Sequence, residues 1–599
     1  MRLAKLVVSN FRSIQRCECT RIEPLQAFVG ENNAGKSNLM RAVKTFLSPG
    51  AGGVAVSDFN DPAQTMTIDA EFSGLSPTER KKLRQYLLGD RLILQKRLTV
   101  QDDQKTARQK VVAEYHGYAA EPKDWYLSTA KIEDREGGRP NWKKVADEAG
   151  ITDYVETADK KVNKTSYTTG LSKYLSDHPE IEYDEPVLGE THALGLQPNL
   201  LAALPEFYLL PAITDYSDEI DRRSSSTVFR QLMGDLSDRI IKSDPRYSEI
   251  EAALAALHRL LNVVGTDEEV GRLDAIGGVE TALTEIIAKL MPSVQSVNLQ
   301  ITVEEPKEMF SRGVTLKVHD GVLTDVLDKG HGLQRSVVFG LLQMLIRTNR
   351  AVENEEGRRP IILGIEEPEL YIHPQSQRLI YNVLKEFAGV RSDPPVGSDQ
   401  VLYTTHAPAF VDIGAYERIG IVRKPDLATG TIVHQCPVGA LGSPDARAGF
   451  KLLTSFTIKH NELFFARRLI LVEGAEDEIA IIAAARKLQL ITDLPDEIGL
   501  AVVVCHNKEQ IPKFQKVLNA FKIKYSVLLE LDGKPETEGK NQEILSLLNG
   551  NAVAKLPDKL ETVVGFRGHF PDVFYTKTFF SNPDNITLSL ENAVTILTN

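Results

Sequence analysis

The sequence predicts an α/β protein with at least two domains. Short apolar runs typical of buried parallel strands occur at residues 25–29, 360–365 and 468–472, and each is followed by a glycine or a carboxylate. Apolar residues at helical spacing follow the first and last of these runs. A chain of 599 residues is also too long for a single hydrophobic core. We therefore expect one α/β domain assembled from distant segments and a second one at the C-terminal end.

Composition narrows the class of protein. With 42% hydrophobic and 25% charged residues, the chain is an ordinary globular protein, which excludes wholesale disorder and fibrous repeats. Its four cysteines show no spacing typical of a disulfide framework or a thiolate metal site. A net charge of -12 argues against coating nucleic acid by bulk electrostatics, although a local basic groove stays open. Without a signal peptide or a membrane-length apolar run, we expect a soluble, cytoplasmic protein with no membrane partner.

The first strand leads into a phosphate-binding loop, Gly30-Glu-Asn-Asn-Ala-Gly-Lys-Ser37, and a helical pattern follows it. Loop amides and the helix N-terminus point N–H groups at an anion, Lys36 adds a charge, and the Ser37 hydroxyl is a Mg²⁺ ligand. We therefore expect ATP at this loop. The residues predicted to contact it here are Gly30, Asn32, Asn33, Ala34, Gly35, Lys36, Ser37 and Asn38.

Two further strands end in candidate catalytic residues. Residues 360–365 lead into Glu366-Glu367-Pro-Glu369, at the strand end where an α/β sheet meets its ligand. We expect Glu366 to hold Mg²⁺, directly or through water, and Glu367 to polarise the attacking water; a solvated acidic loop is the alternative. Residues 401–405 lead into His406. A lone histidine at a strand end is more often structural, but the preceding motifs favour a sensor of the γ-phosphate.

A glycine-containing segment, Asp328-Lys-Gly-His-Gly-Leu-Gln-Arg335, lies between these motifs and precedes an apolar helix over residues 337–346. Glycines let the backbone approach a γ-phosphate, and the following helix supplies its positive end. Gly330, Gly332 and Gln334 are therefore candidate nucleotide ligands. The segment lacks the serine usual in ABC transporter signatures.

In this order, the motifs resemble the RecF/SMC-like branch of ABC ATPases, and most closely the OLD (overcoming lysogenization defect) family. The matching segments are Ser9-Asn-Phe-Arg-Ser13, residues 30–37, residues 329–335, Glu366-Glu-Pro-Glu-Leu-Tyr-Ile-His-Pro374 and Thr405-His-Ala-Pro408. The resemblance covers both ends of the chain well and its middle poorly. It implies Arg12 beside the nucleotide, His406 as the switch that senses the γ-phosphate, and a C-terminal Toprim nuclease domain.

Carboxylates stand where such a Toprim domain needs them. Glu473 follows a strand, Asp477 lies in the first turn of the next helix, and Glu530 and Asp532 lie two apart on one face of a further strand end. We expect these four residues to hold Mg²⁺ or Mn²⁺, with solvated strand ends as the alternative. Two such ions would activate a water and neutralise the leaving oxygen of a phosphodiester.

Other candidates of this site stay open. Lys508 is either catalytic or merely exposed. Lysines near the scissile phosphate often stabilise charge, and Lys540 and Lys577 are candidates for that role. The further acidic ligand that the resemblance implies is sought among Asp572, Glu538 and Glu591.

The middle of the chain carries fewer signals. Apolar and polar residues alternate over residues 66–72 and 92–98, which predicts two strands. A basic helix is expected near residues 80–84, where its charges form either a solvated face or a DNA contact. A helical pattern spans residues 216–291. Its apolar stripe is either an internal bundle or, as the resemblance implies, a dimerisation surface; the stripe comprises Leu254, Leu257, Leu260 and Leu261. The expected domains are an ATPase N-terminal part at 1–215 with a polar, inserted or mobile element near 130–184, a helical dimerisation insertion at 216–300, an ATPase C-terminal part at 301–460, and Toprim at 466–599.

The hypothesis is an ATP-regulated, metal-dependent nuclease that cleaves double-stranded DNA as a homodimer. The resemblance further implies defence against phage and a helicase-like or reverse-transcriptase and noncoding-RNA partner. One alternative is a RecF/SMC-like repair ATPase that binds DNA without cutting it. Another is an ATP-gated sensor or scaffold with a degenerate Toprim domain, because Glu530 stands where the family has aspartate.

Overall fold

The computed structural model describes most of the chain. It covers residues 1–598 other than 84–85, 104–107, 120, 137–139, 156–161, 179, 185–186, 189–202, 213–227, 237–240, 243, 263–271, 292, 304–305, 307–308, 310–313, 352–358, 391–398, 441, 443–462 and 467. The described residues divide into two units, 1–209 with 359–599 and 210–358. Within them, no helix is long and apolar enough to cross a membrane.

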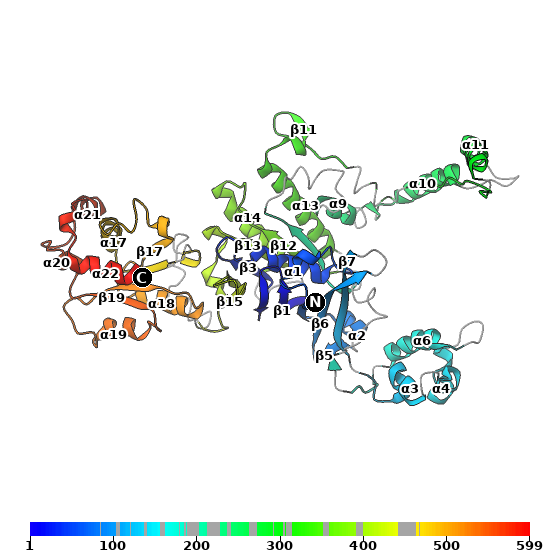
Figure 1. The fold of residues 1–599 in the computed structure, drawn as a ribbon, viewed down its shortest axis with the longest axis horizontal. Helices are drawn as coiled ribbons and strands as arrows, with labels where there is room; N and C mark the ends of the chain where they lie inside the picture. Colours follow the sequence, from blue (N-terminus) through cyan, green and yellow to red (C-terminus); the bar gives the residue numbers. More distant parts are fainter. Residues whose placement is uncertain are drawn as a thin grey trace. The chain divides into compact units, whose positions relative to one another are not determined.

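The N-terminal strands form an antiparallel sheet with the order β2-β1-β4-β6-β7-β8, and β5 pairs with β6. Figure 1 labels β1, β5, β6 and β7 of this sheet. Every second residue of β4 is buried, the pattern expected of a sheet with one face on a core. The strands predicted at residues 66–72 and 92–98 are both present. The bounds are β1 Arg2–Phe11, β2 Ile14–Cys19, β4 Met66–Ser73, β5 Leu87–Leu88, β6 Arg91–Asp103, β7 Arg108–Ala119 and β8 Val187–Leu188.

A second sheet, with the order β15-β14-β3-β13-β12-β9, carries the nucleotide motifs. Its strands β12, β13, β3 and β14 run parallel. All residues of β3, β12 and β13 are buried, which explains why apolar residues predominate in their sequences. The buried polar residues of β3 and β13 are Gln26, Gln400, Thr404 and Thr405. The bounds are β3 Leu25–Val29, β9 Glu206–Leu210, β12 Ile361–Glu366, β13 Gln400–Thr405, β14 Ile419–Arg423 and β15 Ile432–Gln435.

Helix α1 (Lys36–Leu47) follows the phosphate loop and shares one hydrophobic core with both sheets. Its last turn is held by Lys96 of β6, whose fully buried amino group donates to the carbonyls of Thr45 at 2.6 Å and Ser48 at 2.7 Å. Burial lowers the pKa of Lys96 to about 7. Carbonyls at a helix C-terminus favour a cation, so this lysine fixes the end of α1 that is remote from the loop.

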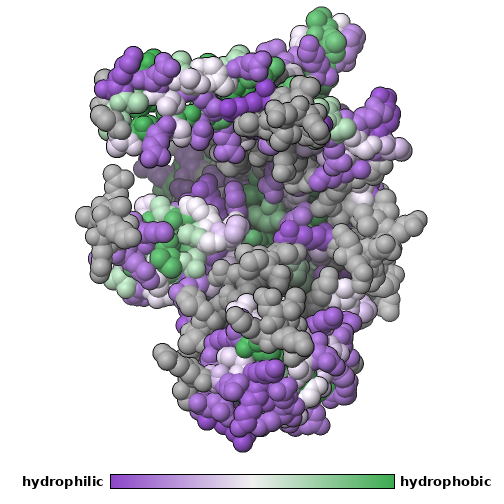
Figure 2. Space-filling model, turned by 90° about the vertical axis from the view of Figure 1, so that its right-hand side faces the viewer, coloured by the Kyte–Doolittle hydropathy of each residue, from purple (hydrophilic) through white to green (hydrophobic). Residues whose placement is uncertain are grey.

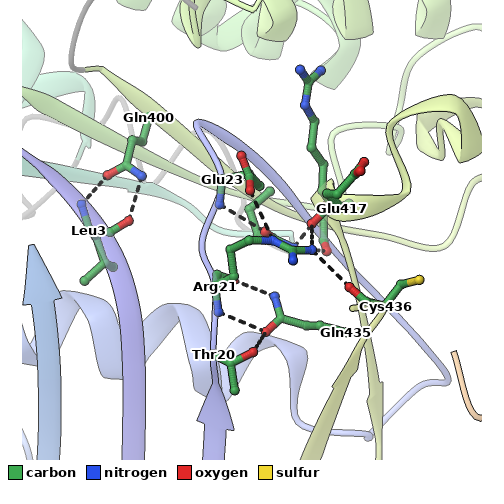
Figure 3. A network of polar contacts seen from close by, with 11 residues as sticks. Leu3, Thr20, Arg21, Glu23, Gln400, Glu417, Gln435 and Cys436 are labelled. Atoms are coloured by element: carbon green, nitrogen blue, oxygen red, sulfur yellow. Dashed lines mark hydrogen bonds and ion pairs between the residues drawn. The ribbon is translucent and has the colours of Figure 1, made fainter. Parts of the chain in front are cut away.

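Side chain to backbone hydrogen bonds join the two sheets (Figure 3). The Gln400 amide donates to and accepts from the backbone of Leu3, at 2.9 and 2.6 Å. Arg21 donates to the carbonyls of Glu417 at 2.8 Å and Cys436 at 3.2 Å. Because these bonds are made to fixed backbone groups, the N-terminal strands and the nucleotide sheet are positioned as one body.

The polar segment near residues 130–184 contains helices with a core of their own. That core includes Ile132, Ala146 and Tyr167, each fully buried. None of the large hydrophobic side chains that are exposed in the described part of the protein belongs to this segment, and the face drawn in Figure 2 is mostly hydrophilic. The segment is thus a small folded helical cluster, and its being an insertion stays a prediction. The bounds are α3 Thr129–Glu136, α4 Trp142–Ala149, α5 Thr152–Val155 and α6 Lys164–Asp177.

The second unit is mainly helical over its described residues, in accord with the predicted pattern. Several parts of that prediction lie outside the described residues, among them 216–227, 237–240 and 263–271. In the first unit, Arg84 of the predicted basic helix also lies outside them. On α10, Leu257 is 43% and Leu260 41% exposed, so the apolar stripe is not the inside of a bundle among the described residues. The bounds are α9 Val228–Leu236, α10 Tyr247–Asn262, α11 Asp274–Leu290 and α13 His331–Ala351.

The C-terminal domain has a parallel four-stranded sheet with the order β17-β16-β18-β19. Ile470, Ile481 and Leu590 are fully buried in the core that α17 and α22 form on it, and α18 contacts β16. The parallel order brings the C-terminal ends of these strands to one edge. The bounds are β16 Arg468–Val472, α17 Ala475–Lys487, β17 Leu500–Val504, α18 Ile511–Ala520, β18 Ser526–Glu530, α19 Gly539–Ser546, β19 Ala552–Leu556, α20 Leu560–Val563, α21 Val573–Phe580 and α22 Leu588–Thr598.

Candidate nucleotide and nuclease sites

Two glycines of the phosphate loop are required by close packing. A Cβ atom on Gly30 would lie 2.1 Å from the carbonyl oxygen of Val422 on the neighbouring strand. At Gly35 the φ angle is 103°, and a Cβ atom there would lie 2.2 Å from the hydroxyl oxygen of Thr431. Any side chain at either position would displace the loop from the sheet, so the loop conformation is encoded in these glycines.

Lys36 folds over the interior of the loop. Its amino group donates to the carbonyls of Gly30 at 2.9 Å and Glu31 at 2.8 Å, and the residue is only 6% exposed. Burial lowers the pKa of Lys36 to about 8, and the nearby charges of Glu367 and Glu369 oppose that shift. Its amino group is therefore placed to exchange loop carbonyls for phosphate oxygens.

The other nucleotide candidates near the N-terminus have partners of their own or lie at the surface. The Asn38 amide donates to the hydroxyl of Ser13 at 2.7 Å, and Ser13 lies 2.8 Å from the Thr431 hydroxyl. Arg12, which the resemblance places beside the nucleotide, has its guanidinium 2.8 Å from one carboxylate oxygen of Asp58 in this structure. Of the remaining candidates, Asn32 and Asn33 are exposed, Ala34 is buried, and Ser37 is half-buried.

The register of the strands brings the motifs at Glu366-Glu367 and His406 beside the phosphate loop. Strand β13 lies between β12 and β3, pairing Thr404 with Glu366 and Thr405 with Val29. Glu366 is 5% exposed at the end of β12. Glu367 follows it with a positive φ of 47°, and its N–H donates to the Thr404 carbonyl at 2.9 Å. Thus Glu366, Glu367 and His406 follow directly from strands that flank the loop-bearing strand.

His406 faces Glu367. Its Nε2 lies 3.5 Å from Oε1 of Glu367. Burial, with a contribution from Lys36, lowers the pKa of His406 to about 4, so the imidazole is neutral near pH 7 and the contact is not an ion pair. A neutral imidazole next to a carboxylate and within electrostatic reach of the loop lysine suits a group that responds to a phosphate.

The signature-type segment lies in the second unit. Gly330 precedes α13 and Gly332 lies in its first turn. The Gln334 amide donates to the Lys329 carbonyl at 2.8 Å, and Arg335 is fully buried. The glycines are thus at the N-terminal end of a long helix, as the sequence predicts.

In the C-terminal domain, four carboxylates gather at the ends of β16 and β18. Asp477 accepts a hydrogen bond from the Gly474 N–H at 2.8 Å and is 4% exposed. Burial and the Asp477 charge raise the pKa of Glu530 to about 9, whereas the pKa of Asp477 itself rises to about 6. Glu473 also has a raised pKa because it is buried, and Asp532 adds to the effect. Since Asp477 and Glu530 are hydrogen-bonded to each other, they share a proton near neutral pH.

Lys508 belongs to this carboxylate cluster. Its amino group donates to Asp532 at 2.6 Å and also to the Glu530 carbonyl, and its side chain is only 14% exposed. The alternative that Lys508 is merely exposed is therefore wrong. The residue follows β17, which pairs with β16, so its position is set by the same sheet edge.

A further strand end was missed from sequence. After β19, the Leu560 N–H donates to a carboxylate oxygen of Glu530 at 2.9 Å, and the charge of Lys559 lowers the pKa of Glu473. No motif marks this turn. Its only signal is that it follows another strand of the same parallel sheet.

The remaining candidates have other partners or are exposed. Lys540 lies 2.8 Å from Glu509 and 2.7 Å from Glu543. Asp572 caps α21, whereas Glu591 lies 2.7 Å from Lys487. Lys577 and Glu538 are exposed. None of these contacts joins the carboxylate cluster.

Family models match both parts of the chain. The AAA ATPase domain matches residues 1–411, and the TOPRIM domain of overcoming lysogenization defect protein-like proteins matches residues 464–532. The chain belongs to the OLD family. It is an ATP-dependent nuclease in which an α/β ATPase domain precedes a Toprim domain, and these domains use a nucleotide and a divalent metal ion.

Two relatives agree with this assignment. The OLD-family chain is 24% identical over 542 residues to the "Old nuclease" of Escherichia phage P2, covering 89% of this chain and 77% of the relative. It is 28% identical over 280 residues to the "OLD nuclease" of Thermus scotoductus, covering 45% of this chain and 49% of that relative.

Similar solved structures include SMC heads. The Smc head bound to the C-terminal winged-helix domain of ScpA has 12% identity and a TM-score of 0.34, with 73% of this chain and 99% of that chain covered. The SMC head domain from Thermotoga maritima has 11% identity and a TM-score of 0.26, with 73% and 100% covered. The family assignment is independent of these matches.

The Toprim cluster of this OLD-family chain is not a preformed metal cage. In the part of the chain that the structure describes, no group of three His, Cys, Asp or Glu side chains is arranged to hold a metal ion. Instead, Asp477 and Glu530 bond each other and Lys508 holds Asp532. The oxygen donors are nevertheless those that Mg²⁺ and Mn²⁺ prefer.

Proposed function

We propose that the Toprim domain is a metal-dependent DNA endonuclease and that ATP turnover controls it. At the nucleotide site, the loop amides and Lys36 bind the phosphates, and Ser37 and Glu366 hold Mg²⁺. Glu367 orients and polarises the attacking water, while His406 senses the γ-phosphate. The contacts among Lys36, Glu367 and His406 support these roles.

The carboxylate cluster carries the nuclease proposal. Glu473, Glu530 and Asp532 lie at the ends of the adjacent strands β16 and β18, and Asp477 lies in the first turn of α17. Burial raises the pKa values of three of these four acids, Glu473, Asp477 and Glu530. Neighbouring carboxylates repel one another when they are ionised, and a purely structural site would offset this repulsion with permanent ion pairs. A cluster that keeps the repulsion between its carboxylates is suited to binding a cation.

The residues present fit Mg²⁺ or Mn²⁺ by donor chemistry. The four carboxylates would hold the metal, which when bound supplies an activated water and charge neutralisation at a phosphodiester. Before that, the Asp477–Glu530 pair must release its proton and Asp532 must part from Lys508. Lys508 is then free to face the scissile phosphate, which gives it a positioned positive charge.

Plasmid cleavage tests the proposal. Supercoiled DNA is incubated with the full chain and Mg²⁺ or Mn²⁺, with and without ATP. We expect nicking by the wild type and a loss of roughly 1000-fold in Asp532→Ala and Glu473→Ala, equal to several kcal/mol of charge stabilisation. ATP hydrolysis should persist in both variants. Asp584→Ala, which removes an exposed carboxylate of the same domain, is the matched control.

Undiminished nicking by both variants would disprove the assignment of the site. Absence of nicking by the wild type in every condition would favour the second candidate, an ATP-gated sensor with a non-cleaving Toprim domain. That candidate draws support from the Lys508–Asp532 contact, which occupies a prospective metal ligand.

The wider setting of the activity is also a proposal. We propose that the substrate is double-stranded DNA. We also propose that the protein is a cytoplasmic homodimer or higher homo-oligomer, joined through the exposed stripe of α10. Its proposed role is phage defence, with or without a helicase-like or reverse-transcriptase and noncoding-RNA partner. Sedimentation of the purified chain tests the dimer. Plating of phage on cells that carry the wild type or Asp532→Ala tests defence.

A further inference from the structure

The Glu369 carboxylate accepts three hydrogen bonds at the nucleotide site. One carboxylate oxygen accepts from the N–H of His406 at 2.6 Å and of Ala407 at 3.1 Å. The other accepts from the Thr405 hydroxyl at 2.9 Å. These donors are the last residue of β13 and the first two residues after it, so a single side chain that follows β12 holds the end of β13 and the start of the turn.

The two strand ends therefore hold each other. In one direction, the Glu367 N–H donates to the Thr404 carbonyl at 2.9 Å. In the other, Glu369 accepts from the backbone of the residue that bears the imidazole. Pro368 stands between the two glutamates and restricts the backbone there, so the distance between Glu367 and Glu369 is fixed by the chain. The His406–Glu367 contact of 3.5 Å is the product of this arrangement.

We propose that Glu369 is a positioning residue of ATP hydrolysis, which acts by holding the backbone of His406 so that its imidazole faces Glu367. This inference rests on the roles proposed above for Glu367 and His406. Glu369 has no part in binding the phosphates, because its carboxylate is engaged with the β13 turn. Its removal should therefore change the catalytic step and leave ATP binding largely intact.

Steady-state ATP hydrolysis by the full chain tests the inference. In Glu369→Ala we expect kcat to fall about 100-fold and the KM for ATP to change less than about threefold, since a misplacement of about 1 Å has effects of that size. Glu369→Gln should recover most of kcat. Its amide oxygen can accept from both N–H groups, and its amide nitrogen can donate to the Thr405 hydroxyl. Glu18→Ala, which removes an exposed carboxylate of β2 that pairs with Lys5, should leave both constants unchanged.

A double-mutant cycle separates positioning from general stability. If Glu369 acts through His406, adding Glu369→Ala to His406→Ala should cause no further loss of kcat. Additive losses would overturn the inference. So would a common fall of kcat, ATP affinity and melting temperature in Glu369→Ala without recovery in Glu369→Gln, because that pattern indicates a purely structural residue.

The assignment of Glu367 and His406 is tested separately. If Glu367→Gln and His406→Ala both hydrolyse ATP at the wild-type rate, the proposed function of these two residues fails, and the inference fails with it. If both lose hydrolysis but Glu369→Ala retains it, only the inference about Glu369 is wrong.

Discussion

Glu369 of the ATPase domain and Glu530 of the Toprim domain occupy similar positions, close to the C-terminal ends of parallel strands, but their donors differ. Glu369 accepts two backbone N–H groups and a hydroxyl. Glu530 accepts one backbone N–H, from Leu560, and otherwise faces Asp477 and Glu473. The same edge of a parallel sheet therefore yields one carboxylate that is satisfied by the protein and another that is repelled by its neighbours.

This difference suits the two kinds of ligand. At the nucleotide site, the protein supplies the hydrogen-bond donors and Lys36 donates to the backbone carbonyls of Gly30 and Glu31, so the incoming group is an anion. At the Toprim cluster, protons and Lys508 compensate for crowded carboxylates, so the incoming group is a cation. The comparison predicts that the sites respond differently to loss of charge and to pH.

Among single substitutions that change ligand affinity, the largest effect should follow removal of the loop cation. In Lys36→Ala we expect ATP affinity to fall roughly 100-fold, because a charged hydrogen bond to phosphate contributes about 2–3 kcal/mol. Isothermal titration calorimetry with ATP measures this loss of affinity. Mg²⁺ binding to the Toprim domain should be unchanged. Equal loss of both would show that the two sites do not have the separate electrostatics described above.

A smaller change for each pH unit should appear in the pH dependence of Mg²⁺ binding to the Toprim cluster, measured in Lys36→Ala without nucleotide. Asp477 has a pKa of about 6 and Glu530 of about 9, so the pair holds one proton between these values. Metal binding requires its release, and affinity should rise about tenfold per pH unit from pH 6 to 9. Above that range the proton is already absent and the rise should end.

Glu530→Gln provides the control for this measurement. It removes the raised carboxyl and should flatten the dependence, although it also weakens Mg²⁺ binding by removing a ligand. A wild-type affinity that is independent of pH between 6 and 9 would contradict the shared proton.

Sequence predicted the strands that carry both candidate sites because buried parallel strands and the glycine loop leave local signals. The apolar run of β12 and the glycines at 30 and 35 are examples. The assignment of ligands at the ends of these strands stays a prediction. It did not predict the role of Glu369 or the approach of Leu560, because hydrogen bonds between segments tens of residues apart leave no periodic trace. The helical core around Tyr167 was missed for a related reason, since short helices with many polar residues show little periodicity.

The smallest predicted effect concerns Lys508. Its amino group competes with a metal ion for Asp532, and such a partly buried ion pair contributes about 1 kcal/mol. In Lys508→Met, Mg²⁺ should therefore bind the Toprim cluster about fivefold more tightly in calorimetry. If Lys508 also faces the scissile phosphate, plasmid nicking at saturating Mg²⁺ should nevertheless be slower. Tighter metal binding with unchanged nicking would show that Lys508 only neutralises Asp532 when no metal ion is bound. Weaker metal binding would show that Lys508 instead holds the carboxylates in place for the metal ion.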